Sequence, residues 1–183
     1  MGHEFDYSRL AGCGIDVYID GRSEIRRPEL VTIGSHVAVD SGFYCTVAAQ
    51  LRDYIHVGPY VTAIGGPGST LRLGHFTTVG AGSRFVCGSD EFLGEGLVGS
   101  CVPDEYRDNV TLSVITIEMF ASIGTNVVVH PGVTLAEGSV VGSGSLVTHD
   151  TEPWTINFGT PALPVRARSR DKMLAAARAM GYL

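Results

Sequence analysis

Residues 117–147 read IEMFASIGTNVVVHPGVTLAEGSVVGSGSLV, and an apolar residue returns at every sixth position of this stretch. The recurring positions are Ile117, Ile123, Val129, Leu135, Val141 and Val147. A second series with the same spacing consists of Ile33, Val39, Cys45, Leu51, Val57 and Ala63. A period of six residues matches neither the 3.6-residue period of an α-helix nor the two-residue period of an ordinary strand.

A second set of mostly small residues stands four positions after each apolar one. Its members are Ala121, Val127, Val133, Ser139 and Ser145. Each block of six therefore predicts a short strand that buries one aliphatic and one smaller side chain and then turns. Such hexapeptide repeats stack as the coils of a parallel β-helix, about 4.8 Å apart. We predict an all-β fold of this kind, with a long central loop and a short C-terminal α-helix.

Breaks in the repeat divide the chain into three parts. Residues 1–30 carry no clear repeat and are expected to form an N-terminal cap, although the alternation over 14–20 also fits a strand or a first imperfect coil. Residues 31–152 are expected to form the β-helix, and residues 153–183 a C-terminal extension with a helix from about 170 to 180, capped by Ser169. Residues 87–113 interrupt the repeats with acids, glycines and aromatic residues, which favours a functional loop over a disordered one.

Composition narrows the range of functions. A chain of 183 residues with a formal charge of -6 and a pI near 5.4 argues against a surface for nucleic acid or for an anionic membrane. The sequence has neither a signal-like N-terminus nor 18 uninterrupted apolar residues, so we expect a cytoplasmic protein. Its four cysteines lie far apart, and we expect neither a metal site nor a disulfide framework.

Four stretches outside the bare repeat carry a resemblance to a known family. They are Asp53–Tyr60 (DYIHVGPY), Cys87–Phe92 (CGSDEF), Val102–Arg107 (VPDEYR), and Glu152–Ile156 (EPWTI) followed by Gly159–Ala162 (GTPA). With the repeats, they make residues 31–170 resemble the hexapeptide-repeat acyltransferases with a left-handed β-helix. Within that family the chain is most similar to the sugar O- and N-acetyltransferases of bacterial surface-polysaccharide pathways, such as O-antigen and lipopolysaccharide biosynthesis.

The resemblance implies a left-handed β-helix, a homotrimer and an acetyl-CoA-dependent reaction. Acetyl-CoA would lie in the groove between neighbouring subunits. The acceptor would be a sugar or a nucleotide-linked amino sugar near the central loop, and direct attack on the thioester would need no metal.

Acetyl transfer needs a base, and histidine is the natural base near neutral pH. We expect His56 to fill this role, because the resemblance is strongest around it; the alternative is an exposed corner histidine. His36 and His75 are expected on the same face as His56 and are candidate substrate contacts. Asp90 and Glu91 are candidates for orienting the base or binding the acceptor, or they are simply solvated loop acids. Relatives that acetylate thiogalactosides carry their catalytic histidine in this loop, where the present sequence has none.

The tetrahedral intermediate needs donors for its oxyanion, and we expect a backbone N–H near Gly80 or Gly82 to supply one. The resemblance places five residues along the CoA groove, with Arg166 near the phosphates. They are Thr125, Ser143, Thr148, His149 and Arg166. Relatives usually carry lysine where this chain has His149.

Two other readings of the repeat remain. A γ-type carbonic anhydrase needs three metal-binding histidines with two close in sequence, whereas the closest internal pair here, His56 and His75, is 19 residues apart. A non-catalytic hexapeptide-repeat scaffold is the more serious alternative. Among enzymes, the sequence leaves O-acetylation and N-acetylation both open.

Overall fold

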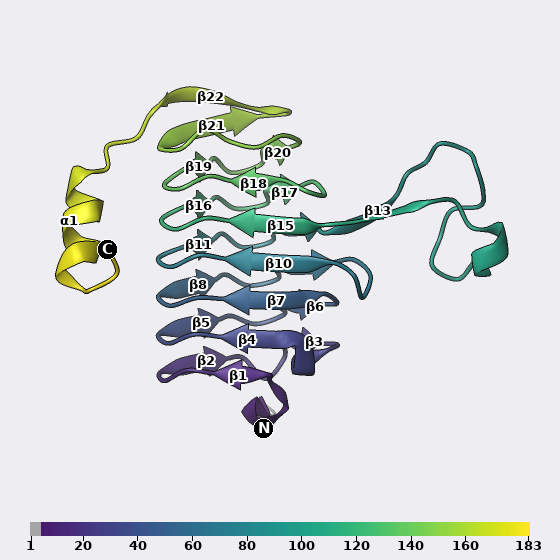
Figure 1. The fold of residues 1–183 in the computed structure, drawn as a ribbon, viewed down its shortest axis with the longest axis horizontal. Helices are drawn as coiled ribbons and strands as arrows, with labels where there is room; N and C mark the ends of the chain where they lie inside the picture. Colours follow the sequence, from purple (N-terminus) through teal and green to yellow (C-terminus); the bar gives the residue numbers. More distant parts are fainter. Residues whose placement is uncertain (1–4) are drawn as a thin grey trace.

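Three parallel sheets wind around a common axis as the faces of a β-solenoid, as predicted (Figure 1). The structure, a computed structural model, describes residues 5–183. Sheet A contains β1 (Gly12–Cys13), β4 (Val31–Ile33), β7 (Ala48–Leu51), β10 (Thr70–Leu73), β15 (Val114–Ile117) and β18 (Thr134–Leu135). Sheet B contains β2 (Val17–Ile19), β5 (Val37–Val39), β8 (Ile55–Val57), β11 (Thr78–Val79), β16 (Ser122–Ile123), β19 (Val140–Val141), β21 (Thr155–Gly159) and β22 (Ala162–Ala167). Sheet C contains β3 (Glu24–Ile25), β6 (Tyr44–Cys45), β9 (Thr62–Ile64), β12 (Arg84–Val86), β17 (Val128–Val129) and β20 (Leu146–Val147).

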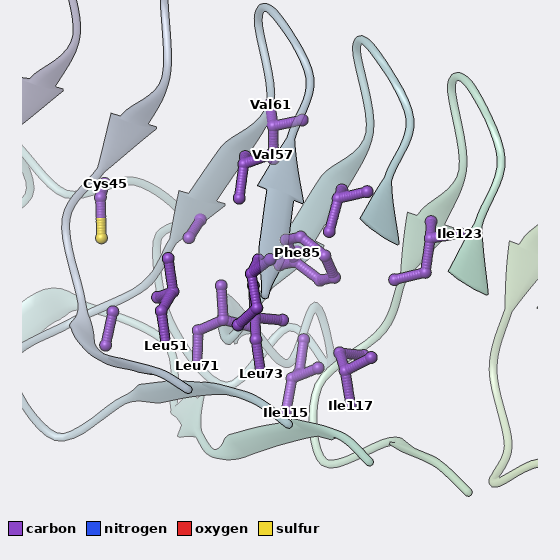
Figure 2. Close-up of a cluster of buried hydrophobic side chains, with 14 of the residues drawn as sticks. Cys45, Leu51, Val57, Val61, Leu71, Leu73, Phe85, Ile115, Ile117 and Ile123 are labelled. Carbon is purple, nitrogen blue, oxygen red and sulfur yellow. The ribbon is translucent and has the colours of Figure 1, made fainter. Parts of the chain in front are cut away.

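The repeat positions form the interior of the solenoid. Every apolar residue of the two six-residue series is buried, and Figure 2 shows Cys45, Leu51 and Phe85 among the side chains that point into the core. Within a strand, the residue between two buried positions faces outward because side chains alternate, as Ala38 does between Val37 and Val39. The strands pair in parallel register one coil apart, as Ala38 pairs with His56. The hexapeptide pattern therefore determines which side chains reach the outer surface.

The solenoid starts earlier in the chain than expected. β1, β2 and β3 pair with β4, β5 and β6, so residues 12–25 form a complete coil where a cap was predicted. Phe5, Tyr7 and Leu10 pack against the core beside this first coil, around a 3₁₀ turn at Tyr7–Arg9. The part of the predicted cap at residues 1–4 lies outside the described residues.

The interruption at residues 87–113 forms an arm that projects sideways from the solenoid (Figure 1). It leaves after β12 and returns into β15, so it lies at the edge where sheet C leads to sheet A. Its base is an antiparallel pair, β13 (Gly88–Asp90) with β14 (Val110–Leu112), and a 3₁₀ turn at Asp104–Tyr106 lies between the two strands in the chain. The arm is thus a built element rather than an irregular loop.

The C-terminal residues close one end of the solenoid and then run back along its side (Figure 1). β21 and β22 form an antiparallel hairpin on the last coil. The helix α1 (Asp171–Ala179) follows, with Arg170 rather than Ser169 at its N-cap position. Arg168 donates hydrogen bonds to the carbonyls of Phe120 and Gly138 at 2.8 and 2.9 Å, which fixes the connection between hairpin and helix.

α1 packs on a column of aromatic rings at the turns between sheets A and B. His36, Tyr54, Phe76 and Phe120 stack in successive coils, with centroids 4.6, 5.1 and 5.5 Å apart. The helix contributes Met173, Leu174 and Ala177 to this contact, and Tyr182 follows them. Its apolar stripe therefore packs against the chain's own solenoid. Among the described residues, no helix is long and apolar enough to span a membrane.

Candidate functional site

The outer face of sheet B carries a continuous row of side chains along the solenoid. Ile55 and Val57 of β8 are buried, so His56 between them points outward. Register places Thr78, Ser122, Val140, Ile156 and Arg166 in successive strands beyond His56. With strands about 4.8 Å apart, the five steps from His56 to Arg166 span roughly 24 Å. The row therefore has a histidine near one end and an arginine at the other.

His56 is paired with a carboxylate that sequence reasoning missed. Its Nε2 lies 2.9 Å from Oδ2 of Asp40, in the turn that follows β5. Because a carboxylate only accepts, the neutral imidazole that makes this hydrogen bond has its proton on Nε2 and a lone pair on Nδ1. Both side chains stay accessible, at 54% and 37% exposure. The pair can accept a proton at Nδ1 and stabilise the resulting imidazolium with the charge of Asp40.

A sequence signal for this carboxylate did exist. His56 pairs in register with Ala38, and the amide of Asp40 donates to the carbonyl of Val57. Because one coil separates Ala38 from His56, the position one coil after Asp40 lies close to His56. The hexad pattern marks core positions, but outward neighbours appear only when whole coils are aligned.

The two arm acids do not meet His56 within one chain. Asp90 ends β13, and Glu91 accepts a hydrogen bond from the Thr111 hydroxyl at 3.1 Å. Both sit on the arm at the edge between sheets C and A, whereas His56 lies on sheet B. Asp90 instead lines a pocket of about 310 Å³ at the base of the arm. The other lining residues include Gly65, Gly66, Pro67, Ser89, Ser100, Arg107 and Leu112.

His36 and His75 lie in turns between sheets A and B, not on the strand face predicted for them. The neighbours of His56 in sheet B are Ala38 and Thr78, because the parallel register selects these positions. Nδ1 of His36 lies 2.9 Å from Oδ2 of Asp16. The structure therefore separates both histidines from the row.

His75 is built into a small polar cluster. Its Nδ1 accepts the backbone N–H of Asp53 at 3.1 Å, and the hydroxyl of Tyr182 donates to Oδ2 of Asp53 at 2.9 Å. Burial lowers the pKa of His75. The pKa of Asp53 is also lowered, because the hydrogen bonds from Ser35 and Tyr182 outweigh the effect of burial, which alone would raise it. His75 and Asp53 line a groove of about 390 Å³ on the sheet A side.

The five residues expected along the CoA groove divide into two groups. Thr125 and Ser143 occupy successive turns between sheets B and C, and the Thr125 N–H donates to Oγ of Ser143 at 3.1 Å. These turns lie at the edge of sheet B, whose outer face carries Arg166. Thr148 and His149 follow β20 at the opposite edge of sheet C, with Oγ1 and Nδ1 of the two residues 2.9 Å apart.

The expected oxyanion donors are already used by the fold. The N–H of Gly80 donates to the carbonyl of Ile123, and that of Gly82 donates to the carbonyl of Pro59, both at 2.8 Å. Neither group is free for a ligand, because the coil-to-coil ladder and the turns consume backbone donors. Among residues 5–183, the structure shows no cluster of three or more histidine, cysteine, aspartate or glutamate side chains placed to hold a metal ion.

Comparison with known sequences points to sugar acyltransferases. The chain is 28% identical to the dTDP-4-amino-4,6-dideoxy-D-glucose acyltransferase of Escherichia coli over 162 residues, which cover 86% of this chain and 82% of that protein. It is 29% identical to the galactoside O-acetyltransferase of Escherichia coli K12 over 157 residues, covering 84% of this chain and 72% of the relative. No family model matches the chain.

Solved structures share the fold over most or all of the chain. AntD, an N-acyltransferase from Bacillus cereus, superposes with a TM-score of 0.90 at 22% identity, and all of both chains are covered. That structure, of an AntD variant, holds dTDP-4-amino-4,6-dideoxyglucose and coenzyme A. A hexapeptide-repeat acetyltransferase from Vibrio cholerae, solved with acetyl coenzyme A, has a TM-score of 0.59 at 20% identity over 88% of this chain and 73% of its own. These findings confirm the predicted resemblance and favour an enzyme over a non-catalytic scaffold.

Proposed function

We propose that this acyltransferase of the hexapeptide-repeat class moves an acetyl or related acyl group from CoA to the amino group of a nucleotide-linked amino sugar. The observation that carries the proposal is the row on sheet B, with the His56–Asp40 pair at one end and Arg166 at the other. Two similar proteins support this choice of acceptor. The Escherichia coli relative is named as an acyltransferase of dTDP-4-amino-4,6-dideoxy-D-glucose, and AntD is an N-acyltransferase whose structure holds the same kind of dTDP-linked 4-amino sugar.

The row suits an extended CoA molecule. CoA carries its thioester and its diphosphate at opposite ends of the pantetheine arm, and the row offers a base at one end and a guanidinium at the other. Arg166 is exposed and would form charge-assisted hydrogen bonds with the phosphates. The half-buried Val140 and Ile156 would pack against the arm, with Thr125 and Ser143 beside it. The thioester would then lie near His56.

His56 acts as general base in the proposed reaction. The acceptor nitrogen attacks the thioester carbonyl and forms a tetrahedral intermediate, and Nδ1 of His56 takes a proton from that nitrogen. Asp40 stabilises the imidazolium so formed. The carbon–sulfur bond then breaks, and His56 returns its proton to the departing thiolate. The products are the N-acylated sugar and CoA.

A second copy of the chain is needed to bring the arm to the row. The arm exposes large apolar side chains, which ordered protein surfaces usually cover. They include Phe92, Leu93, Leu97 and Tyr106, each at least 62% exposed. In the homotrimer we propose, the arm of one copy lies against sheet B of the next. Asp90 and Glu91 would then bind the acceptor amine near His56. We place this reaction in the cytoplasmic synthesis of surface-polysaccharide precursors.

The experiment that tests the proposal is thiol release from acetyl-CoA with matched acceptors. The enzyme should release CoA from acetyl-CoA when the acceptor is a dTDP-linked 4-amino sugar. It should not do so with the corresponding 4-hydroxy sugar or with a simple galactoside. Replacing His56 by Asn should lower turnover at unchanged CoA affinity. Release with the hydroxylated sugars alone would refute N-acylation. Failure of the folded protein to bind any acyl-CoA would refute the proposed function altogether.

A further inference from the structure

Phe158 is an aromatic side chain held on the outer surface of the terminal hairpin. It lies near the tip of β21, in the hairpin that closes the solenoid (Figure 1), and 49% of its surface is exposed. The core of the solenoid does not need it, because the buried cluster includes neither Phe158 nor its strand partner Leu163.

The ring is nevertheless held firmly. It covers Gly142, where an added Cβ would lie only 1.7 Å from Cε1 of Phe158. Next to it, the N–H of Gly159 donates to Oγ of Ser145 at 3.1 Å. Asn157 is buried and donates to the carbonyl of Val140 at 3.2 Å. The surroundings of Phe158 therefore fix an exposed ring in one place.

Phe158 shares its face with Arg166. Asn157 points inward, so Ile156 and Phe158 on either side of it point outward. Ile156 pairs with Arg166 in the hairpin. Two residues along a strand correspond to about 7 Å, so a planar ring and a guanidinium lie close together at the end of the row farthest from His56.

We propose that Phe158 is the stacking surface for the adenine ring of CoA. The inference rests on the proposed function, in which Arg166 binds the phosphates and the thioester lies near His56. Adenine is joined to those phosphates through ribose, so it must lie near Arg166 and beyond the pantetheine arm. A purine stacks well on an aromatic ring whose other side is already covered by Gly142.

The test compares two ligands that differ only in the nucleotide part. Affinities for CoA and for pantetheine, which lacks the adenosine and its phosphates, are measured by calorimetry in wild type, Phe158→Ala and Phe158→Trp. Leu163→Ala is the control, since Leu163 is the exposed strand partner of Phe158. We expect Phe158→Ala to weaken CoA binding about tenfold, equivalent to about 1.4 kcal/mol, and to change pantetheine binding hardly at all, because only CoA carries a base that can stack on the ring. Phe158→Trp and Leu163→Ala should bind CoA like wild type.

Three results with the Phe158→Ala variant would overturn the assignment of Phe158. They are unchanged CoA affinity in Phe158→Ala, an equal loss for CoA and pantetheine, and a change in oligomeric mass, which would make the ring a subunit contact. Equal affinities of the wild-type protein for pantetheine and for CoA would also overturn it, because the adenosine would then contribute nothing to binding. Wild-type protein that binds neither ligand would refute the proposed function itself, so the two failures are distinguishable.

Discussion

Replacing Asp40 by Asn tests how His56 works. The substitution removes the negative charge beside the imidazole but keeps an amide oxygen that can accept the same hydrogen bond. The two charges of an imidazolium–aspartate pair at 2.9 Å attract by about 1.4 kcal/mol at the dielectric constant of water. The dielectric constant of water is the appropriate value here, because both side chains are more than a third exposed. Since the imidazolium exists only after proton transfer, we expect turnover to fall about tenfold with KM unchanged.

The assay is steady-state thiol release with kcat and KM determined separately. Replacing His56 by Asn should reduce kcat by about a hundredfold or more, which is typical of losing a general base. Asp16→Asn is a matched control, because it disturbs a second aspartate–histidine pair, with His36, at the same 2.9 Å. That control should leave kcat unchanged, since the His36 pair lies in the turn between sheets A and B.

The double variant decides whether Asp40 acts through His56. If it does, removing the carboxylate from an enzyme that already lacks the imidazole has no further effect. Asp40→Asn with His56→Asn should then be as slow as His56→Asn alone. An additional tenfold loss in the double variant, or a wild-type rate in Asp40→Asn, would refute this reasoning.

Three more predictions follow from the geometry. Arg166→Ala should raise the KM for acetyl-CoA about tenfold with kcat unchanged, as expected when a charged hydrogen bond is lost; a fall in kcat alone would contradict its placement at the phosphates. Burial lowers the pKa of His75 from its usual 6.5, so its contribution to stability is complete above pH 6.5 and is lost as the pH falls from there through the lowered pKa of the folded state. Thermal unfolding at pH 7.5 and 5.5 should therefore show a smaller drop in Tm for His75→Gln than for wild type, and equal drops would argue against this linkage. Phe92→Asp with Leu93→Asp should reduce the oligomeric mass in light scattering, whereas Leu183→Asp, also at an exposed leucine, should not; an unchanged mass would show that the arm is not a subunit contact.

The core of the solenoid could be predicted from the sequence because burial imposes a strict pattern on it. Each inward position in a middle coil touches coils on both sides, so only side chains of suitable size fit. The first coil has a neighbouring coil on one side only. Its buried positions Ile19 and Ile25 keep the spacing, but Gly12 and Cys13 of β1 are not buried, and the repeat fades. That is why residues 12–25 look like a cap rather than a coil.

The candidate site was predictable only in part. The outward position of His56 follows from the buried residues on either side of it, and Arg166 follows from the resemblance. Asp40 lies in the turn after β5 and Phe158 on β21, and their relation to the row depends on how whole coils align. The arm acids show the same limit, since they lie at the edge between sheets C and A and only the proposed assembly would bring them near His56.

The aromatic column shows why the side chains that α1 packs against could not be predicted from local sequence patterns. Tyr54, Phe76 and Phe120 have φ angles of +58°, +59° and +64°, a conformation usually left to glycine or asparagine. Each such residue costs about 1–2 kcal/mol, and no local pattern predicts it. Each stacked pair stabilises the fold by about 0.5–1.5 kcal/mol in addition to the contribution of its buried area. The helix α1 buries the Phe120 end of the column. The strained turns therefore become favourable only when several coils and the helix are in place, so their stability depends on the assembled solenoid rather than on any single repeat.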